Sequence, residues 1–167
     1  MAEPTNSTAS IAGLKIAEVD PQGADALALL REAAIEARSL YPELFAADAP
    51  WPGNPPTPER GVYLVAYSEG KALACGALRP IDAATVEVRR MFVSVCARRK
   101  GLARAILLEL ERRAAVFGYT LMRLETGKRQ LSAIALYETL GFKRIPPFGE
   151  YAEDPVSVCF EKAVGPR

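Results

Sequence analysis

One continuous stretch, residues 86–118, constrains the fold more than any other, because a strand leads into a helix there through a very short connection. Residues 86–95 alternate between apolar and polar side chains and then become apolar and rich in β-branched residues, which predicts a strand. From Leu102 onwards the apolar residues follow helical spacing along one stripe. This stripe consists of Leu102, Ile106, Leu107, Leu110, Ala114 and Phe117. The stretch therefore predicts a strand and a helix joined by a turn at residues 96–101.

The turn at residues 96–101 has the character of an anion site. Its three cations, located where the helix exposes unpaired N–H groups, are Arg98, Arg99 and Lys100. A helix N-terminus with free donors and a partial positive charge binds phosphate groups. A run of cations is more often an ordinary solvated surface, but Gly101 and Ala103 leave room here for a bound group. The backbone amides of the first helical turn can then surround a pyrophosphate, with Arg98 and Arg104 adding charge-assisted hydrogen bonds.

The rest of the chain reads as short strands and helices without a repeat. Apolar alternation and β-branched runs predict strands at residues 14–19, 62–67, 72–78, 85–95, 121–125, 142–145 and 156–162. Helical spacing predicts helices at residues 24–40, from near Gly101 to a stop at Gly118, and at residues 131–140. This order of elements predicts a mixed α/β fold that is not doubly wound.

Residues 41–60 form the longest segment without a helical or strand pattern. They contain six prolines and the only tryptophan of the chain, Trp51, and prolines exclude a regular element. A loop of this length inside a compact domain is usually functional or disordered, and the aromatic residues Tyr41, Phe45 and Trp51 favour a functional loop. The alternative is a surface loop in which Trp51 only covers the core.

Composition limits the classes of function. A chain of 167 residues that is half apolar fits one compact domain, which we expect at residues 13–167 after a polar, mobile leader at residues 1–12. Basic and acidic residues number 21 and 20, so global charge gives no support for binding to nucleic acid or a membrane surface. The absence of histidine and the wide spacing of three cysteines argue against a metal site. With no secretory signal or membrane span in the sequence, we expect a cytoplasmic protein.

A second segment, residues 124–144, reads LETGKRQLSAIALYETLGFKR. By itself it predicts a strand, a polar turn, a helix that buries Ile134, Leu136 and Leu140, and a glycine stop, and nothing in this pattern requires an enzyme. Together, however, the two segments resemble the GNAT superfamily of N-acetyltransferases, of an uncharacterised-substrate bacterial type. Arg98-x-x-Gly101-x-Ala103 is similar to the acyl-CoA-binding pattern Gln/Arg-x-x-Gly-x-Gly/Ala. The stretch from Ala133 through Leu136-Tyr137-Glu138 to Gly141-Phe142 is similar to the late helix-to-strand segment of that superfamily.

The resemblance implies a central sheet of about six or seven strands with helices on both faces, splayed at its two middle strands. These strands are residues 87–95 and 121–125, and acetyl-CoA would lie in the V-shaped opening between them, where separated backbone groups need new partners. The backbone of Met91, Phe92 and Val93 would contact the pantetheine arm and the thioester oxygen. The implied cofactor contacts are Met91, Phe92, Val93, Arg98, Arg99, Lys100, Gly101, Leu102, Ala103, Arg104 and Tyr137. No metal is implied.

Three residues are candidates for proton transfer by the same resemblance. Tyr137 matches the tyrosine that protonates the leaving CoA thiolate, and Glu87 matches a glutamate that acts as base in several members. Glu125 is the alternative base or an amine-binding carboxylate. As alternatives, Tyr137 is a core aromatic residue and Glu87 lies on the solvated face of its strand. The superfamily's cofactor-binding Asn is not carried over, because Arg129, Gln130 and Ser132 occupy that region.

The acceptor pocket is expected to involve the proline-rich loop and the loop after the last helix. Its candidate residues are Trp51, Arg89, Glu125, Phe148 and Tyr151. Acidic residues there favour a cationic amine, whereas Arg89 and Arg90 favour an acceptor with a carboxylate. The expected activity is transfer of the acetyl group from acetyl-CoA to a small-molecule or protein amine by direct attack in a ternary complex. The alternatives are a catalytically silent CoA-binding or sensing module and, third, a nucleic-acid-associated protein. The final strand offers an edge for a homodimer.

Overall fold

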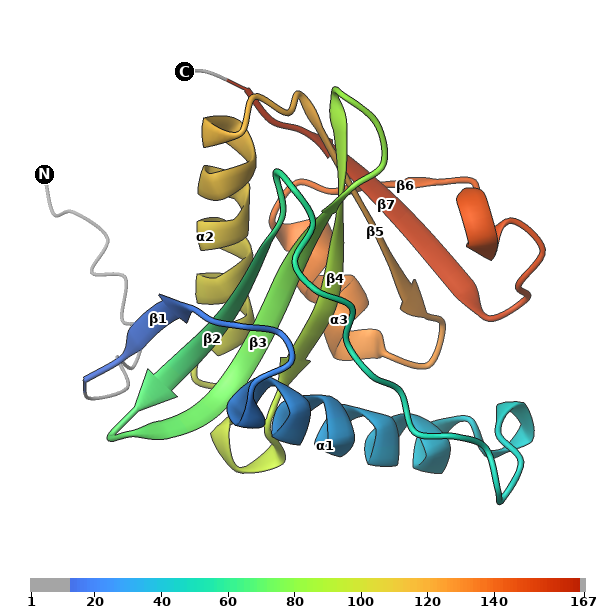
Figure 1. The fold of residues 1–167 in the computed structure, drawn as a ribbon. Coiled ribbons are helices and arrows are strands. Elements are labelled where there is room, and N and C mark those ends of the chain that lie inside the picture. The colour runs from blue at the N-terminus through green and yellow to red at the C-terminus, as the bar shows by residue number, and fades with distance from the viewer. Residues whose placement is uncertain (1–12, 166–167) are drawn as a thin grey trace, which may run out of the picture.

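The computed structural model describes residues 13–165, and the expected leader at residues 1–12 lies outside them. One seven-stranded sheet in the order β1-β2-β3-β4-β5-β7-β6 forms the centre of the molecule (Figure 1). Its strands are β1 (Lys15–Glu18), β2 (Val62–Ser68), β3 (Lys71–Pro80), β4 (Thr85–Val93), β5 (Leu121–Gly127), β6 (Lys143–Ile145) and β7 (Ser157–Ala163). The helices are α1 (Ala24–Leu40), α2 (Leu102–Val116) and α3 (Leu131–Thr139), and the 3₁₀ turns are η1 (Pro42–Leu44), η2 (Val95–Ala97) and η3 (Gly149–Tyr151). The predicted mixed α/β fold is confirmed, whereas the final strand is not the expected free edge, because β7 pairs with both β5 and β6.

Element boundaries differ from the sequence-based expectation by one or two residues at every strand, most clearly at β3, β4 and β5, and also in the long loop. β3 runs from Lys71 to Pro80, one residue earlier and two residues later than expected. β4 ends at Val93, two residues early, because the next residues turn into η2. β5 continues to Gly127, two residues further than expected, because it pairs with β7 along its whole length. The loop at residues 41–60 does contain one regular turn, η1, which starts at Pro42, since proline is well suited to the first position of a helical turn.

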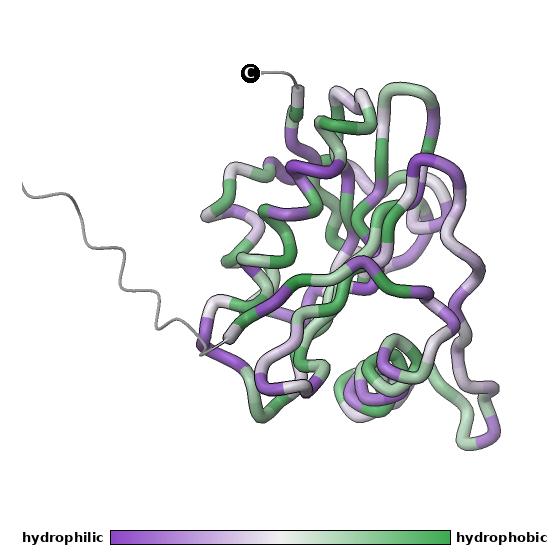
Figure 2. Tube along the Cα trace, turned by 60° about the vertical axis from the view of Figure 1, so that its left-hand side comes forward, coloured by the Kyte–Doolittle hydropathy of each residue, from purple (hydrophilic) through white to green (hydrophobic). Residues whose placement is uncertain are grey.

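Helices cover both faces of the sheet, as expected. On one face, α2 and α3 pack over a large core that includes Leu64, Val88, Ile106 and Phe160. On the other face, α1 packs over a smaller cluster formed by alternate residues of β2 and β3. Hydrophobic residues are concentrated in the central strands (Figure 2). The two faces therefore take alternate side chains of the same strands, as the two-residue period of a strand requires.

The buried face of α3 is smaller than the sequence suggests. Tyr137 is the buried residue of this helix, and Ile134, Leu136 and Leu140 are only half-buried where they pack against the core. The expectation that these three residues are buried is therefore wrong, because each of them keeps part of its surface exposed to solvent. Only one residue of α3 therefore reaches the core fully.

The parallel pair β4 and β5 opens along its length. The two strands pair at four positions, from Thr85 opposite Leu121 to Val88 opposite Leu124. Beyond these positions β4 stays paired with β3 and β5 stays paired with β7, and the two strands diverge (Figure 1). The predicted opening between the two central strands is present, and it begins after Val88.

Helix α1 is tied to the chain that follows the open end of β4. The Ser94 hydroxyl donates a hydrogen bond to a Glu32 carboxylate oxygen at 3.0 Å, and the Arg98 guanidinium pairs with Glu36 at 2.5 Å. These contacts join residues that are 62 positions apart in the sequence. The helix is therefore attached to one arm of the opening through two of its own turns.

The C-terminal end of α1 is tied to the other arm. The Tyr41 hydroxyl accepts a hydrogen bond from the Arg129 backbone N–H at 3.0 Å, and the Arg129 guanidinium donates to the Leu40 carbonyl at 2.9 Å. Tyr41 is buried, and its ring end lies against the backbone of Gly127 at the end of β5. Helix α1 thus bridges the two arms and limits how far they separate.

Replacing Gly127 with alanine is expected to lower the free energy of unfolding by about 1–3 kcal/mol, the usual cost of overpacking. A Cβ there would overlap the Tyr41 hydroxyl and would lie 2.6 Å from Tyr41 Cζ and 2.8 Å from Gln130 Oε1. Urea unfolding measures the change. Gly53→Ala is the matched control, because no described neighbour lies within 4 Å of a Cβ at that position. Equal stability of the two variants would contradict the role given to Tyr41.

Candidate active site

A cavity of about 460 Å³ lies beside the open segment of β4. Helix α1 and the proline-rich loop form one side of it, and Tyr63, Cys75, Arg90, Met91 and Phe92 form the sheet side. Its walls are mostly apolar. A cavity of this size, next to strand edges without a strand partner, is suited to a ligand with an apolar body.

The anion turn after β4 has the geometry that the sequence predicts. Gly101 caps α2 in the left-handed conformation with φ of 79°, and Arg99 also has a positive φ of 63°. Glycine suits the cap because it has no Cβ to be strained there. No described side chain caps the helix, and its first turn holds no acidic residue, so its first N–H groups are free of side-chain partners. The turn can therefore accept an anion through its backbone.

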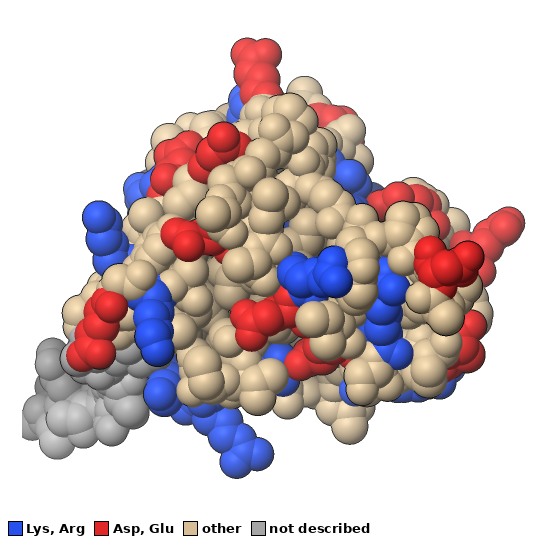
Figure 3. Space-filling view, turned by 60° about the horizontal axis from the view of Figure 1, so that its bottom comes forward, with Lys and Arg blue, Asp and Glu red and all other residues tan. Residues whose placement is uncertain are grey.

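The basic residues of this turn differ in what they contact. Arg99 and Lys100 are exposed and Arg104 is half-buried, whereas Arg98 donates to the Val93 carbonyl at 3.0 Å as well as pairing with Glu36. Leu102 is buried in the core, so only its backbone faces the turn. Basic and acidic side chains are interspersed on the face that carries α1 and this turn (Figure 3). To bind a phosphate, the Arg98 guanidinium must therefore either leave Glu36 or contact Glu36 and the phosphate at the same time.

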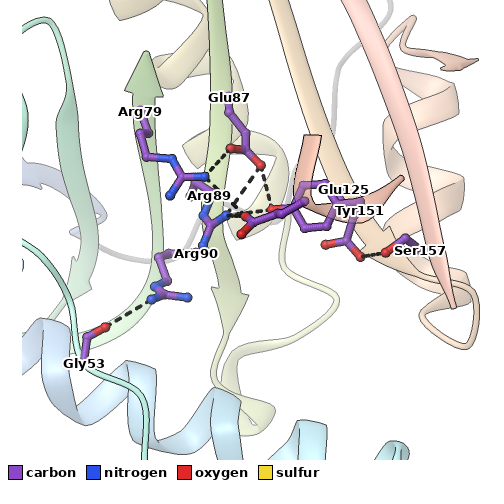
Figure 4. Close-up of polar contacts among 9 residues, drawn as sticks. Gly53, Arg79, Glu87, Arg89, Arg90, Glu125, Tyr151 and Ser157 are labelled. Carbon is purple, nitrogen blue, oxygen red and sulfur yellow. Dashed lines mark hydrogen bonds and ion pairs between the residues drawn. The ribbon is translucent and has the colours of Figure 1, made fainter. Parts of the chain in front are cut away.

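Glu87 lies in the closed part of β4, and its side chain is only 3% exposed. Its carboxylate accepts hydrogen bonds from Arg79 at 2.8 Å and from the Tyr151 hydroxyl at 2.7 Å (Figure 4). Arg89 lies 3.6 Å from the same carboxylate and pairs with Glu150 at 2.8 Å. The alternative of a solvated Glu87 is therefore wrong, and both of its oxygens are engaged.

Tyr151 connects this network to the loop that contains η3. Besides donating to Glu87, its hydroxyl accepts a hydrogen bond from Arg89 at 2.6 Å, and its ring contacts Phe148 edge-on with centroids 5.4 Å apart. Burial and the hydrogen bond to Glu87 raise the pKa of the Tyr151 phenol. Of the residues expected to form the acceptor pocket, Arg89, Tyr151 and Phe148 are brought together here.

Glu125 is the first residue of β5 past the last pair with β4. One of its carboxylate oxygens accepts a hydrogen bond from the Ser157 hydroxyl at 3.0 Å (Figure 4). Burial raises the pKa of the Glu125 carboxyl, and the negative charge of Asp154 adds to this shift. A carboxylate with a raised pKa and few partners is a better proton acceptor than one held by two arginines.

Tyr137 projects from α3 into the large core and is 5% exposed. Its ring lies between Phe142 and Phe160, with centroid distances of 6.0 and 5.9 Å. Burial, together with the negative charge of Glu125, raises the pKa of its phenol. The hydroxyl therefore keeps its proton at neutral pH. The same burial is expected of a core aromatic residue, so both interpretations of Tyr137 stay open on packing alone.

Trp51 lies apart from the Glu87 network and lines the cavity beside α1. Its ring is sandwiched between two guanidinium groups, with Arg31 at 3.4 Å and Arg38 at 3.7 Å from the ring centroid. Arg38 also donates to the carbonyls of Ala49 and Pro50 at 2.8 and 3.0 Å. At 42% exposure Trp51 does not cover the core, and the loop is instead folded onto α1.

Several residues in or beside the cavity were not identified from the sequence. Ala33, Ala34 and Ala37 of α1 face the cavity, and Asn54 of the loop is buried and contacts Arg90. The alanines resemble any helix face, so no sequence signal marks them. A buried asparagine within a proline-rich loop carries at most a weak signal, because turns favour this residue as well.

Within residues 13–165, no helix combines the length and apolar character needed to cross a bilayer. In the same part of the chain, no group of three or more His, Cys, Asp or Glu side chains is arranged to hold a metal ion.

Comparison with known proteins places these features in a family context. Residues 26–142 match the Acetyltransferase (GNAT) family. IAA acetyltransferase from Azospirillum brasilense is 40% identical over 101 residues, which are 60% of this chain and 66% of that protein. The match thus spans slightly less than two thirds of the length of this relative.

Solved structures share the fold over almost the whole chain. The putative acyl-CoA N-acyltransferase from Klebsiella pneumoniae is 30% identical and has a TM-score of 0.75, over 91% of this chain and 98% of that one. A GNAT family acetyltransferase from Elizabethkingia anophelis, solved with acetyl-CoA bound, has a TM-score of 0.65 and 16% identity over 90% and 98% of the two chains. At that identity the second similarity concerns the fold alone.

Proposed function

Because the chain belongs to the GNAT acetyltransferase family, we propose that it is an acetyl-CoA-dependent N-acetyltransferase that acts on a primary amine by direct attack in a ternary complex. The observation that carries this proposal is the opening of β4 from β5 after Val88, next to the anion turn. Backbone groups that lose their strand partner need other hydrogen bonds, and the amides of a pantetheine arm supply them. The acetyl-CoA bound to the Elizabethkingia protein supports this choice of cofactor.

In this proposal the cofactor runs along the open edge of β4. Met91, Phe92 and Val93 contact the pantetheine arm and the thioester through their backbone, and the pyrophosphate binds at the anion turn. A backbone N–H directed at the thioester oxygen stabilises the charge that develops during attack by about 3 kcal/mol. Met91 lies beside the register shift of β4 against β3, where the pleat is interrupted. Such a bulge reorients backbone groups, which favours this segment for the acyl group.

Replacing Arg104 with alanine is expected to weaken acetyl-CoA binding about 10- to 100-fold, the range for loss of a hydrogen bond between charged groups. Titration calorimetry measures the Kd, and the dependence on salt concentration should become shallower in the variant. Arg112→Ala is the control, because Arg112 lies on the same helix but pairs with Glu109 on the surface. An equal loss of affinity in both variants would contradict a specific phosphate contact.

The base that removes the amine proton is either Glu125 or Glu87, directly or through water. Glu125 is favoured by its raised pKa, its single hydrogen-bond partner and its position where the strands separate. Glu87 stays a prediction from the family resemblance; its engagement by Arg79 and Tyr151 favours a role in holding Arg89 and the η3 loop. In the transfer step the amine nitrogen bonds to the acetyl carbon, the carbon–sulfur bond breaks, and the amine proton passes to the base.

Tyr137 is proposed to donate a hydrogen bond to the sulfur as it leaves. Its phenol pKa is raised above the ordinary value of about 10, whereas an ordinary thiol has a pKa of about 8.5. Complete proton transfer to the thiolate is therefore uphill within the site. The hydrogen bond itself stabilises the developing negative charge. As CoA leaves, its sulfur takes the phenol proton, and the proton that the base accepted from the amine restores the Tyr137 hydroxyl through solvent.

Thiol release from acetyl-CoA in the presence of a panel of amines, combined with calorimetry of CoA binding, tests the proposal. Amine-dependent release is the expected result. Tight CoA binding without release for any amine would favour the catalytically silent CoA-binding module. Retention on DNA that weakens steeply with salt, without CoA binding, would favour a nucleic-acid-associated protein.

A further inference from the structure

Arg90 occupies an unusual position at the edge of the cavity. It lies in the open segment of β4, at the register shift between the Arg89–Ala77 and Phe92–Cys75 pairs, and its backbone φ is 60°. A non-glycine residue in this region is uncommon and costs of the order of 1 kcal/mol or more. Bulges of this kind change the direction in which a side chain points. Here the Arg90 side chain is directed to the wall of the cavity instead of following the pleat.

The Arg90 guanidinium has only neutral partners. Its Nε donates to Asn54 Oδ1 at 3.0 Å and its Nη2 donates to the Gly53 carbonyl at 3.2 Å. Among residues 13–165, no carboxylate lies within ion-pairing distance of it. Burial, together with the positive charges of Arg89 and Arg79, lowers the pKa of Arg90. A half-buried arginine without a counter-ion is costly unless a ligand supplies one.

This environment is built to hold the guanidinium in place. Asn54 is 7% exposed, and its amide nitrogen donates to the Pro21 carbonyl at 2.8 Å and lies 3.4 Å from the Tyr63 hydroxyl. These contacts orient the Asn54 side chain so that its oxygen faces Arg90. The guanidinium is therefore fixed from one side, while its opposite side borders the cavity.

The charge balance around Arg90 indicates what kind of anion fits. Arg79 and Arg89 are paired with Glu87 and Glu150, so these four charges cancel. Arg90 then leaves one uncompensated positive charge on the sheet side of the cavity, and Arg38, which also lines the cavity and donates only to backbone carbonyls, adds a second on the side of α1. Glu125, on the other side of Arg89 in Figure 4, adds a negative charge beside the expected reaction centre. Arginine side chains without carboxylate partners in an otherwise mostly apolar cavity, with the Glu125 carboxylate at the neighbouring opening of β4 from β5, match a molecule that carries both a carboxylate and an ammonium group.

We propose that Arg90 binds the carboxylate of the acceptor, and that the acceptor is an amino acid with an apolar body. This inference rests on the proposed function. The amine is placed near Glu125 and the thioester, and the apolar body lies against the alanines of α1 and Phe45. The CoA phosphates do not compete for Arg90, because in the proposed function they bind at the anion turn beyond the far end of β4, about 10 Å further along a strand. Arg90 is thus a specificity-determining residue.

The test compares amines that differ only in the carboxylate. L-Phenylalanine and 5-aminopentanoate, which place the two charges at different separations, are each paired with the corresponding amide. In the wild-type protein kcat/KM for at least one amino acid should exceed that for its amide by about 10- to 100-fold, the range for a charge-assisted hydrogen bond. Arg90→Gln should reduce this ratio to about one, and Arg90→Lys should restore part of it, since lysine keeps the charge but not the planar fork.

Two controls separate this inference from the proposed function and from loss of fold. The Kd of acetyl-CoA should be unchanged in Arg90→Gln, and Arg112→Gln should leave every ratio as in the wild type. Equal turnover of amino acids and amides by the wild type, or an equal loss of all substrates in Arg90→Gln, would overturn the role of Arg90 while leaving the transferase intact. If no amine supports thiol release, the proposed function fails. The role of Arg90 is then decided by calorimetry, which compares the Kd of L-phenylalanine with the Kd of its amide for the CoA-loaded protein.

Discussion

Replacing Tyr137 with phenylalanine is expected to lower kcat for acetyl transfer about 10²- to 10³-fold, within the range found for loss of a general acid. The hydroxyl is the only group removed, and the ring still packs between Phe142 and Phe160. The Kd for acetyl-CoA and the free energy of unfolding should therefore stay close to the wild-type values. Thiol release under saturating substrates measures kcat, and calorimetry measures the Kd.

Tyr67→Phe serves as the matched control for this variant. The Tyr67 hydroxyl donates to Asp25 at 2.7 Å, on the α1 side of β2 and away from the opening. This control should keep full activity. Full activity in Tyr137→Phe would show that Tyr137 is a core aromatic residue only, and that solvent protonates the departing thiolate.

Glu125→Gln is expected to reduce kcat/KM at pH 7 about 10²- to 10³-fold, because the amine then loses its proton acceptor. In the wild type, activity should rise as pH passes through the raised pKa of Glu125, since only the deprotonated carboxylate accepts a proton. The variant should lack this dependence. Its deficit should shrink as pH approaches the pKa of the amine, about 10 for an alkyl amine such as lysine, because the free amine then needs no base. A pH series of kcat/KM measures both effects.

Stability distinguishes a lost base from a damaged fold in this variant. A carboxyl whose pKa is raised by burial stabilises the folded state in its protonated form, and this contribution is lost as pH rises through the raised pKa. At pH 7 the buried charge opposes folding, so Glu125→Gln should unfold no more easily than the wild type. At acidic pH the two proteins should converge. A marked loss of stability at pH 7 would mean that the activity loss has a structural cause.

Glu87→Gln separates the two candidate bases. Glutamine there weakens the contacts to Arg79 and Tyr151, so the free energy of unfolding should fall. If Glu125 is the base, kcat/KM of the Glu87→Gln variant should still rise with pH as the Glu125 carboxyl loses its proton. If this rise is absent in Glu87→Gln but present in Glu125→Gln, Glu87 is the base, as the family resemblance first suggested.

The elements themselves were largely predictable, because their signals are local. The helical stripe that begins at Leu102 and the alternation in β2 each depend on residues within one segment. Where β5 was predicted two residues short, the missing information was its partner: Thr126 and Gly127 belong to the strand because β7 pairs with them. Pairing between distant segments has no local signature.

The candidate site residues also divide into those with a local sequence signal and those whose contacts depend on distant segments. Motif positions such as Gly101 and Tyr137 were identified from spacing and resemblance; Gly101 caps α2 in the anion turn, and Tyr137 is buried in the large core. The contacts of Arg98, Glu87 and Arg90 were not accessible, since their partners Glu36, Tyr151 and Asn54 lie 62, 64 and 36 positions away. Spacing alone did not reveal that Arg89 is paired with Glu150, whereas Arg90, the next residue of the same strand, has no carboxylate partner among the described residues.

By itself, the sequence determined the order and kind of the elements, the anion turn, and the family resemblance, because hydrophobic period and turn chemistry act over a few residues. Only the tertiary structure decided where β4 leaves β5, that α1 bridges the two arms, and that Arg90 lacks a counter-ion among the described residues. The physical reason is that strand separation and charge compensation depend on which distant groups the whole packed chain brings within a few ångströms of one another.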